Sequence, residues 1–447
     1  MATNEGSDSA DEALVTRAGH NRPRIGLRPD VSGPRRRTSL LAPLSAGASL
    51  VVIAVLGATF LLGAPSDGPA VVPSPPTVPV SSPLPVNPRP VARVPDSIDA
   101  TGATDVTDAL QSFLDNVEDG STIQMHAGGR YRVDETLWLV GRHDLEWDGS
   151  GATIEATTEV ATNRRNISLS DSTWIRIHDL TIRGTNPAPS TFDEAHQFEH
   201  GIWIDGGSDI EIAAVAIENP RGDCIYIGDG DGSLAWAERI SIHDSTCKAP
   251  GRNGIAVVGG RDVRIESNAF EAVGLHVVDI EPNRVDGRGG TEEARPVQGA
   301  ANVAVLENGI TGPVPGYFFA ANGWGKIDGL IVRNNELAQA PLRITVQPLP
   351  ESGFIRTGII IQGNRSDTAY DAADDAAMRF TRTTDLTVRG NLGPLTGAGS
   401  ALVEIRESCR IDVGGNEYPG GALELRGIAG ACPAATAATL VRSAGKP

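Results

Sequence analysis

The stretch of sequence that decides the fold occurs nine times, and one copy reads Val303-Ala304-Val305-Leu306-Glu307-Asn308. Its pattern is apolar–x–apolar, followed by a marked position three residues after the second apolar residue. The copies start 35, 30, 23, 40, 27, 29, 27 and 25 residues apart. A fixed motif with elastic spacing is typical of stacked coils whose loops vary while their strands do not. The marked residues are Leu180, Val215 and Ser245, then six consecutive asparagines: Asn268, Asn308, Asn335, Asn364, Asn391 and Asn416.

This pattern predicts an all-β fold, a parallel solenoid. The two apolar residues of each copy face one side of a strand, and stacked coils bury them against one another. Asparagine tolerates the left-handed backbone of a tight corner, and stacked side-chain amides can hydrogen-bond from coil to coil. An antiparallel sandwich with asparagine in its turns is the alternative, and six asparagines in register argue against it.

A membrane module is predicted ahead of the solenoid. Residues 38–63 carry no charge and are long enough to cross a bilayer core of about 30 Å. Arg35-Arg36-Arg37 precedes them, so the positive-inside rule places residues 1–37, a segment predicted to be disordered, in the cytoplasm. The expected location is therefore a cell membrane, with one signal anchor and the solenoid outside the cytoplasm. The bias of thirty-five arginines over three lysines is typical of a GC-rich bacterial genome. A cleaved signal peptide is the rival interpretation, but Pro65 makes a poor cleavage site.

The remaining segments follow from composition. Residues 64–95 contain eleven prolines and are typical of a semi-rigid polyproline II spacer. Residues 96–435 form the predicted solenoid domain, and residues 436–447 form a C-terminal tail. The formal net charge of −18 argues against nucleic acid as a partner.

The four cysteines fall into two pairs of equal separation. Cys224 and Cys247 lie 23 residues apart, as do Cys409 and Cys432. That separation is about one coil, so each pair is predicted to form a disulfide in an oxidising compartment. Buried free thiols are the alternative.

The beginning of the solenoid resembles pectate-lyase-like proteins. The resemblance rests on residues 96–155, which include Ala127-Gly128-Gly129-Arg130-Tyr131-Arg132-Val133 and Gly149-Ser150-Gly151-Ala152-Thr153-Ile154. It implies a right-handed parallel β-helix with a short N-terminal capping helix. Residues 107–117 are the predicted cap, since Leu110, Phe113 and Leu114 share one helical face.

A narrower stretch is similar to polygalacturonases. Gly222-Asp223-Cys224-Ile225, then Cys247, then Arg252-Asn253-Gly254-Ile255 resembles that family's acidic pair before Cys-Ile, second cysteine and Gly-His-Gly-Ile. In the family, three carboxylates and the histidine serve catalysis. Here Asn253 replaces the histidine, and Asp223 alone matches a catalytic carboxylate.

A candidate site follows from strand alternation in four segments, beginning at Gly201, Cys224, Gly254 and Val277. Their apolar residues point inward, which leaves three outward columns on adjacent coils. The columns are Trp203, Tyr226, Ala256 and Asp279; Asp205, Gly228, Val258 and Glu281; and His200, Asp223, Asn253 and His276.

These columns suggest sugar chemistry. The backbone positions of Asp279 and Glu281 lie about 6.5–7 Å apart, which overlaps the carboxyl separation of inverting glycosidases. His276 and Asp223 complete the predicted catalytic set, and Trp203 and Tyr226 offer flat surfaces for sugar rings. The other predicted substrate-binding residues are Asp205, His200, Asn253, Arg252 and Arg284, with Asn283 beside them. Solvated surface carboxylates and structural turn residues are the alternatives.

The sequence also contains two weaker functional signals. Asp229 and Asp231 alternate with glycine and resemble a calcium loop, although a polar turn in a long coil loop is the commoner explanation. No other cofactor is predicted. The loop 187–199 is either a wall over the outward columns or a simple insertion.

The sequence as a whole favours a membrane-anchored β-helix that recognises polysaccharide or acts on it as a lyase, hydrolase or epimerase. The alternatives are a non-catalytic glycan-binding or adhesin module and a structural envelope protein, because one scaffold hosts many functions.

Overall fold

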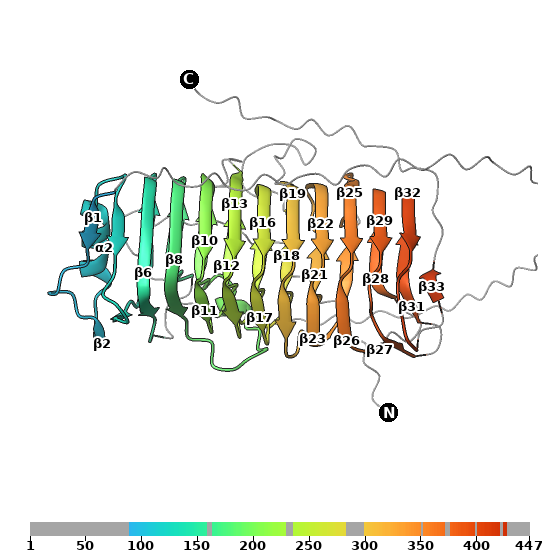
Figure 1. The fold of residues 1–447 in the computed structure, drawn as a ribbon, viewed down its shortest axis with the longest axis horizontal. Coiled ribbons are helices and arrows are strands. Elements are labelled where there is room, and N and C mark those ends of the chain that lie inside the picture. The colour runs from blue at the N-terminus through green and yellow to red at the C-terminus, as the bar shows by residue number, and fades with distance from the viewer. Residues whose placement is uncertain are drawn as a thin grey trace, which may run out of the picture. The chain divides into compact units, whose positions relative to one another are not determined.

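The computed structural model describes residues 89–158, 163–228, 236–282, 299–349, 352–371, 376–397, 400–420 and 423–426. These residues form a stack of parallel coils (Figure 1). From β9 to β26, each coil gives one strand to an eleven-stranded sheet and then two strands to a twenty-stranded sheet. The predicted parallel solenoid is confirmed, and the antiparallel alternative is wrong.

The strands of the eleven-stranded sheet, in the described residues, are β5 (Leu137–Val140), β7 (Ile167–Ser170), β9 (Ile202–Asp205), β12 (Ile225–Gly228), β15 (Ile255–Val257), β18 (Val278–Ile280), β21 (Phe319–Ala321), β24 (Ile344–Val346), β28 (Ala376–Thr381), β31 (Ala401–Arg406) and β33 (Leu423–Arg426). Those of the twenty-stranded sheet are β1 (Val91–Arg93), β2 (Thr101–Asp105), β3 (Thr122–Gln124), β4 (Arg130–Arg132), β6 (His143–Glu155), β8 (Thr173–Arg183), β10 (Ser208–Ala213), β11 (Ala216–Glu218), β13 (Ala237–His243), β14 (Thr246–Lys248), β16 (Gly260–Glu266), β17 (Ala269–Glu271), β19 (Gly299–Leu306), β20 (Gly309–Thr311), β22 (Lys326–Arg333), β23 (Glu336–Pro341), β25 (Arg356–Gln362), β26 (Arg365–Thr368), β29 (Thr383–Arg389) and β32 (Cys409–Gly414). The remaining elements are β27 (Tyr370–Asp371) and β30 (Leu395–Thr396), which pair with each other, the helix α2 (Thr107–Asn116) and the 3₁₀ turn η2 (Glu194–His196).

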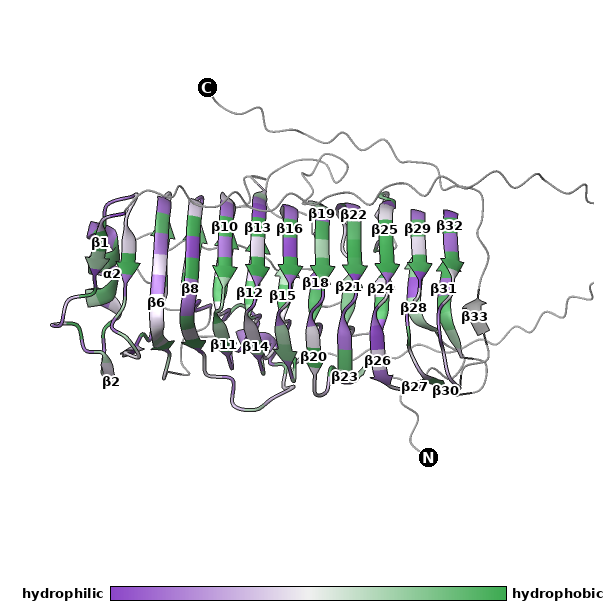
Figure 2. Cartoon of the chain, in the orientation of Figure 1, coloured by the Kyte–Doolittle hydropathy of each residue, from purple (hydrophilic) through white to green (hydrophobic). Residues whose placement is uncertain are grey.

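The nine apolar motifs lie in register, each opposite the next. Ile175 pairs with Ile210, and the series continues without a slip to Leu386 and Ile411. In Figure 2 the hydrophobic colour accordingly recurs at the same level in neighbouring strands such as β10, β13 and β16. The apolar motif residues are buried in one continuous core, except Ile411 and Val413 of the last motif, which pack against that core and are partly exposed. The pattern in the sequence therefore marks the core of the fold.

The six asparagines form a buried ladder. The Asn308 side chain donates to Asn335 Oδ1 at 3.0 Å, and Asn335 donates in the same way to Asn364 Oδ1 at 2.8 Å. Each backbone N–H along the row also donates to the next asparagine oxygen, as Asn308 N does to Asn335 Oδ1 at 2.9 Å. Coil-to-coil bonding by stacked amides is thus confirmed.

The predicted reason for asparagine at the corner is wrong. The left-handed backbone belongs to the residue before each asparagine, such as Ser267 at φ 54°, Asn334 at φ 55° and Gly363 at φ 68°. The ladder asparagines do not have positive φ. The preceding residue makes the corner, and this turn directs the asparagine side chain inward, where only another amide satisfies it.

Helix α2 lies at the N-terminal end of the stack, at the position predicted for a cap (Figure 1). Leu110 and Leu114 are fully buried in the core. The Gln111 side chain accepts from the backbone N–H of Trp138 at 2.7 Å and donates to the backbone oxygen of Trp138 at 3.0 Å. It therefore satisfies polar backbone groups on β5, the edge strand of its sheet.

The predicted anchor (38–63), the segment before it and most of the proline-rich linker lie outside the described residues. Among the helices that the structure describes, none is both long and apolar enough to cross a membrane. Membrane anchoring therefore stays a prediction from the sequence.

Candidate functional site

The outward columns of the eleven-stranded sheet have the predicted register. Trp203 pairs with Tyr226, Tyr226 with Ala256, and Ala256 with Asp279. The alternate residues of the same strands, such as Ile202, belong to the core. Strand alternation thus brings Trp203, Tyr226 and Asp279 to one face of adjacent coils, as expected.

These side chains do not form the open strip that the sequence predicts. Trp203, Tyr226 and Asp279 are 5%, 6% and 5% exposed. The Trp203 and Tyr226 rings lie 4.4 Å apart between centroids, and the Arg165 guanidinium lies over Trp203 at 3.8 Å. The aromatic surface is thus largely covered. No sequence pattern pointed to Arg165, because the proximity of Arg165 to Trp203 depends on a loop rather than on a strand register.

The second column is only partly a strand feature. Asp205 pairs with Gly228 in β9 and β12, whereas Val258 and Glu281 follow the ends of β15 and β18. Asp205 and Glu281 are partly exposed.

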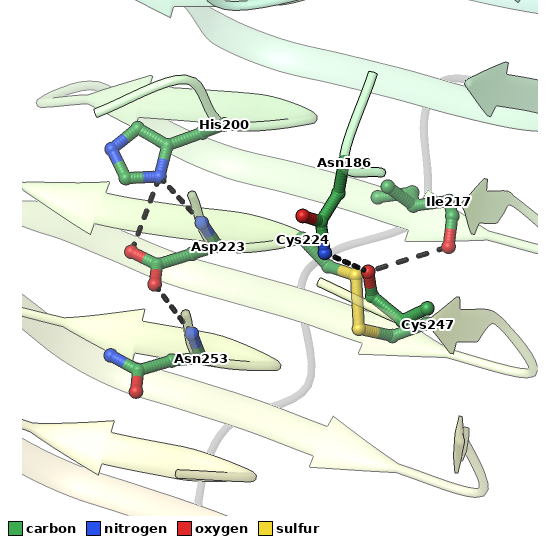
Figure 3. Close-up of a disulfide and its surroundings, with 8 residues drawn as sticks. Asn186, His200, Ile217, Asp223, Cys224, Cys247 and Asn253 are labelled. Atoms are coloured by element: carbon green, nitrogen blue, oxygen red, sulfur yellow. Dashed lines mark hydrogen bonds and ion pairs between the residues drawn. A yellow bond between two sulfur atoms is a disulfide. The ribbon is translucent and has the colours of Figure 1, made fainter. Parts of the chain in front are cut away.

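The third column is a second ladder, built from mixed polar side chains. His200 Nδ1 accepts from the backbone N–H of Asp223 at 3.0 Å, and Asp223 Oδ1 accepts from that of Asn253 at 2.9 Å (Figure 3). Asn253 Oδ1 then accepts from His276 N at 3.1 Å, and His276 Nδ1 accepts from Tyr317 N at 2.9 Å. Each side chain therefore supports the coil that follows it.

Arg252 connects this ladder to the carboxylates beside it. Its Nη1 lies 3.2 Å from Asp223 Oδ2, and its Nη2 forms an ion pair with Glu281. The Asn253 amide donates to Asp279 Oδ2 at 3.3 Å. Three of the predicted carboxylates thus meet in one cluster around Arg252 and Asn253.

Electrostatics assigns different protonation behaviour to these groups. Burial opposes ionisation of Asp223, but Arg252 and His200 outweigh it and hold its pKa below the usual range. Burial, together with Arg252 and Arg343, lowers the pKa of His276 to about 3. Burial also lowers the pKa of His200, despite the nearby Asp223 carboxylate.

Asp223 and His276 therefore have the geometry of structural groups. Asp223 is ionised and paired, and His276 is neutral near pH 7, so neither is poised to exchange a proton there. Of the predicted catalytic set, Asp279 and Glu281 remain candidates for proton transfer to a substrate. Glu281 is partly exposed, whereas Asp279 is buried.

The loop 187–199 is tied to the same side of the coils by ion pairs. His196 Nδ1 lies 2.6 Å from Glu199 Oε1, and Arg164 Nη2 lies 3.5 Å from Glu199 Oε2. Glu199 and Arg164 are both buried. The end of the loop is therefore anchored to the coils, and a wall over the outward columns stays a prediction.

One predicted disulfide is confirmed. Cys224 and Cys247 are bonded, with their Cα atoms 5.9 Å apart, and the bridge lies beside the His200–Asp223 contact (Figure 3). Cys409 is also disulfide-bonded, while its predicted partner Cys432 lies outside the described residues.

Several predicted residues cannot be placed. Asn283, Arg284 and the calcium-loop candidates Asp229 and Asp231 lie outside the described residues. In the part of the chain that the structure describes, one group of carboxylates and imidazole is close enough to share a metal ion: Asp148, His178 and Asp179. This group lies on the twenty-stranded sheet, and the sequence patterns did not point to it.

Comparisons with known proteins agree with the fold. No family model and no curated protein matches the chain. Among solved structures, the endo-xylogalacturonan hydrolase from Aspergillus tubingensis matches with a TM-score of 0.52 and 15% identity, over 77% of this chain and 98% of that one. PfbA, a surface adhesin of Streptococcus pneumoniae, matches with a TM-score of 0.50 and 14% identity, over 74% of this chain and 99% of that one. At such identities the likeness shows the fold alone, a parallel β-helix, as the sequence predicts.

Proposed function

We propose that this protein recognises polysaccharide through the outer face of the eleven-stranded sheet. One observation carries the proposal: aromatic and carboxylate side chains follow one another along a single column. From β5 to β18 that column reads Trp138, Ser168, Trp203, Tyr226, Ala256 and Asp279. Six strands at the stacking distance span about 24 Å, the length of several sugar rings.

Trp138 is the accessible end of this column. It is 39% exposed, whereas Trp203 is covered by Arg165. An exposed indole offers a flat apolar face to a sugar ring and an N–H to a hydroxyl group. A sugar reaching Trp203 would replace Arg165 over the ring, and the displaced guanidinium would be free to bind a hydroxyl or carboxylate of the ligand.

The carboxylates at the other end favour a second candidate, an enzyme acting on the same polymer. Asp279 and Glu281 lie on one strand and its continuation, and Glu281 is partly exposed beside Arg252. Two carboxylates near a bound sugar are the minimum for glycosidic-bond chemistry. Since Asp223 and His276 are held in structural roles, binding is the better-supported function.

The proposal includes a location. A span at residues 38–63 would hold the β-helix outside the cytoplasm, and the Cys224–Cys247 disulfide suits an oxidising compartment. The linker would then raise the binding face above the membrane.

The test is binding of the full chain to a panel of neutral and acidic polysaccharides, with the same samples assayed for new reducing or unsaturated ends. We expect Trp138→Ala to weaken binding at least about fivefold, which corresponds to about 1 kcal/mol. Trp236→Ala is the matched control, because Trp236 is another partly exposed tryptophan but lies just before β13 of the twenty-stranded sheet, outside the column.

The outcomes separate the candidates. Binding without new ends supports a recognition module, and new ends that disappear in Glu281→Gln support the enzyme. Absence of binding to every polysaccharide, or equal loss in the two tryptophan variants, would contradict the proposal.

A further inference from the structure

A second cluster of ionisable side chains lies on the twenty-stranded sheet, away from the proposed glycan face. It sits on β6 and β8, which pair in parallel and lie next to each other in Figure 1. Asp148 is opposite His178 in the strand register, and Asp179 follows His178 at the corner. One ligand atom from each of these three residues lies within 4.8 Å of the other two.

The His178 ring is oriented by its neighbours. Its Nδ1 lies 2.7 Å from Asp179 Oδ2, and its Nε2 lies 3.2 Å from Glu146 Oε1. Arg176 Nη1 holds the same Glu146 oxygen at 3.3 Å. In a metal-bound histidine, one ring nitrogen binds the ion, and the N–H of the other nitrogen usually donates to a carboxylate. Glu146 is placed to be that carboxylate for His178.

Neighbouring groups hold the two aspartates and the imidazole around one point. Ser150 N donates to Asp148 Oδ1 at 2.8 Å, and Gln124 Nε2 donates to Asp148 Oδ2 at 3.2 Å. In the tautomer in which Nε2–H donates to Glu146, His178 Nδ1 and the aspartate oxygens are acceptors that face one another. A metal ion bound among them would interact with all three.

The site is open to solvent on one side. A hollow of about 420 Å³ adjoins it, with Asp179 and Ser150 in its wall. Three protein ligands beside an open space leave a coordination position free for water or another small ligand.

We propose that Asp148, His178 Nδ1 and Asp179 bind one divalent transition-metal ion, of the class that accepts imidazole and carboxylate together, such as Zn²⁺. Tetrahedral bonds of about 2.0–2.2 Å place two ligand atoms about 3.3–3.6 Å apart, so His178 Nδ1 and Asp179 Oδ2 must separate by about 0.6–0.9 Å from their 2.7 Å contact. Calcium is a poorer match, since it prefers oxygen ligands alone.

The fold supplies an internal control two coils further along. His243 repeats the arrangement, with Nδ1 2.8 Å from Asp244 Oδ2 and Nε2 3.2 Å from Glu211 Oε1. The position that corresponds to Asp148 is Ala213. The His243 coil therefore has the same ion pairs but lacks the third ligand.

The experiment is calorimetric titration of ZnCl₂ into the full chain after treatment with a chelator. We expect one site that Asp148→Ala weakens at least about 100-fold, and that Glu146→Gln weakens about 10- to 100-fold through its effect on the ring. His243→Ala and Asp244→Ala should leave the affinity unchanged. Asp148→Ala reproduces the composition of the His243 coil, so it is a mild change for the strand.

Anomalous diffraction from Zn²⁺-soaked crystals gives a second readout, which requires no variant. A peak between His178 and Asp179 supports the proposal. Unchanged affinity in Asp148→Ala, equal loss in His243→Ala, or anomalous density only elsewhere in the molecule would overturn it.

Discussion

Asn335 bonds to both neighbouring coils through a side chain that solvent does not reach. It accepts from Asn308 and donates to Asn364 and to the backbone oxygen of Val305. Asn335→Leu removes the acceptor of the Asn308 backbone N–H and of one N–H of the Asn308 side chain, so we expect a loss of about 1–3 kcal/mol in the free energy of unfolding. Chemical denaturation measures it, with the exposed Asn116→Leu as control, for which we expect a change within about 0.5 kcal/mol. An unchanged midpoint in Asn335→Leu would show that the ladder adds nothing to stability.

His276 predicts a pH dependence. Burial, Arg252 and Arg343 lower its folded-state pKa to about 3, while the unfolded chain titrates near 6.5. Below about pH 6.5 the unfolded state binds the extra proton, so stability is complete above that pH and falls as the pH drops toward 3. The loss is at most about 1.4 kcal/mol per pH unit from this residue.

His276→Asn isolates this effect, because Asn253 already fills the same ladder position in the preceding coil. Unfolding by urea at pH 7.5 and pH 5.0 should show about 2 kcal/mol less pH dependence in the variant than in the unaltered protein. Identical pH dependence in both proteins would mean that folding does not lower the pKa of His276.

At the scale of elements, the Cys224–Cys247 bridge joins the start of β12 to β14 across one coil. It closes a chain segment of 23 residues, for which the loop-entropy model gives about 3 kcal/mol. The double variant Cys224→Ala/Cys247→Ala should lose roughly that amount in chemical denaturation. Treating the double variant with a reductant measures separately the contribution of the second disulfide, at Cys409. A double variant as stable as the parent would exclude a stabilising role for the Cys224–Cys247 bridge.

At the scale of the whole molecule, the charge-free run after Arg35-Arg36-Arg37 predicts an N-in, C-out topology. Protease added to intact cells should cut within residues 64–95 and release most of the chain as one resistant fragment, because the strands of the described coils are paired in continuous sheets. Permeabilised cells provide the control for access. Complete protection of residues 64–95 in intact cells would reject this topology.

The sequence by itself determined the architecture. The apolar–x–apolar motif recurs with one period per coil, and a two-residue alternation fixes which side of a strand is buried. The same repetition fixed the row from Asn268 to Asn416 and brought Cys224 within reach of Cys247. These features follow from the strand register, which the repeated motif sets, so they do not depend on the conformation of the loops.

Only the tertiary structure decided what the outward residues do. It buried Trp203 under Arg165, converted Asp223 and His276 into supports for the next coil, and brought Asp148 to His178 and Asp179 on a face that no motif marked. Each of these contacts joins a side chain to a residue of another coil. Their distances, burial and charge depend on how corners and loops direct side chains in space, and the alternation along a strand does not encode that direction.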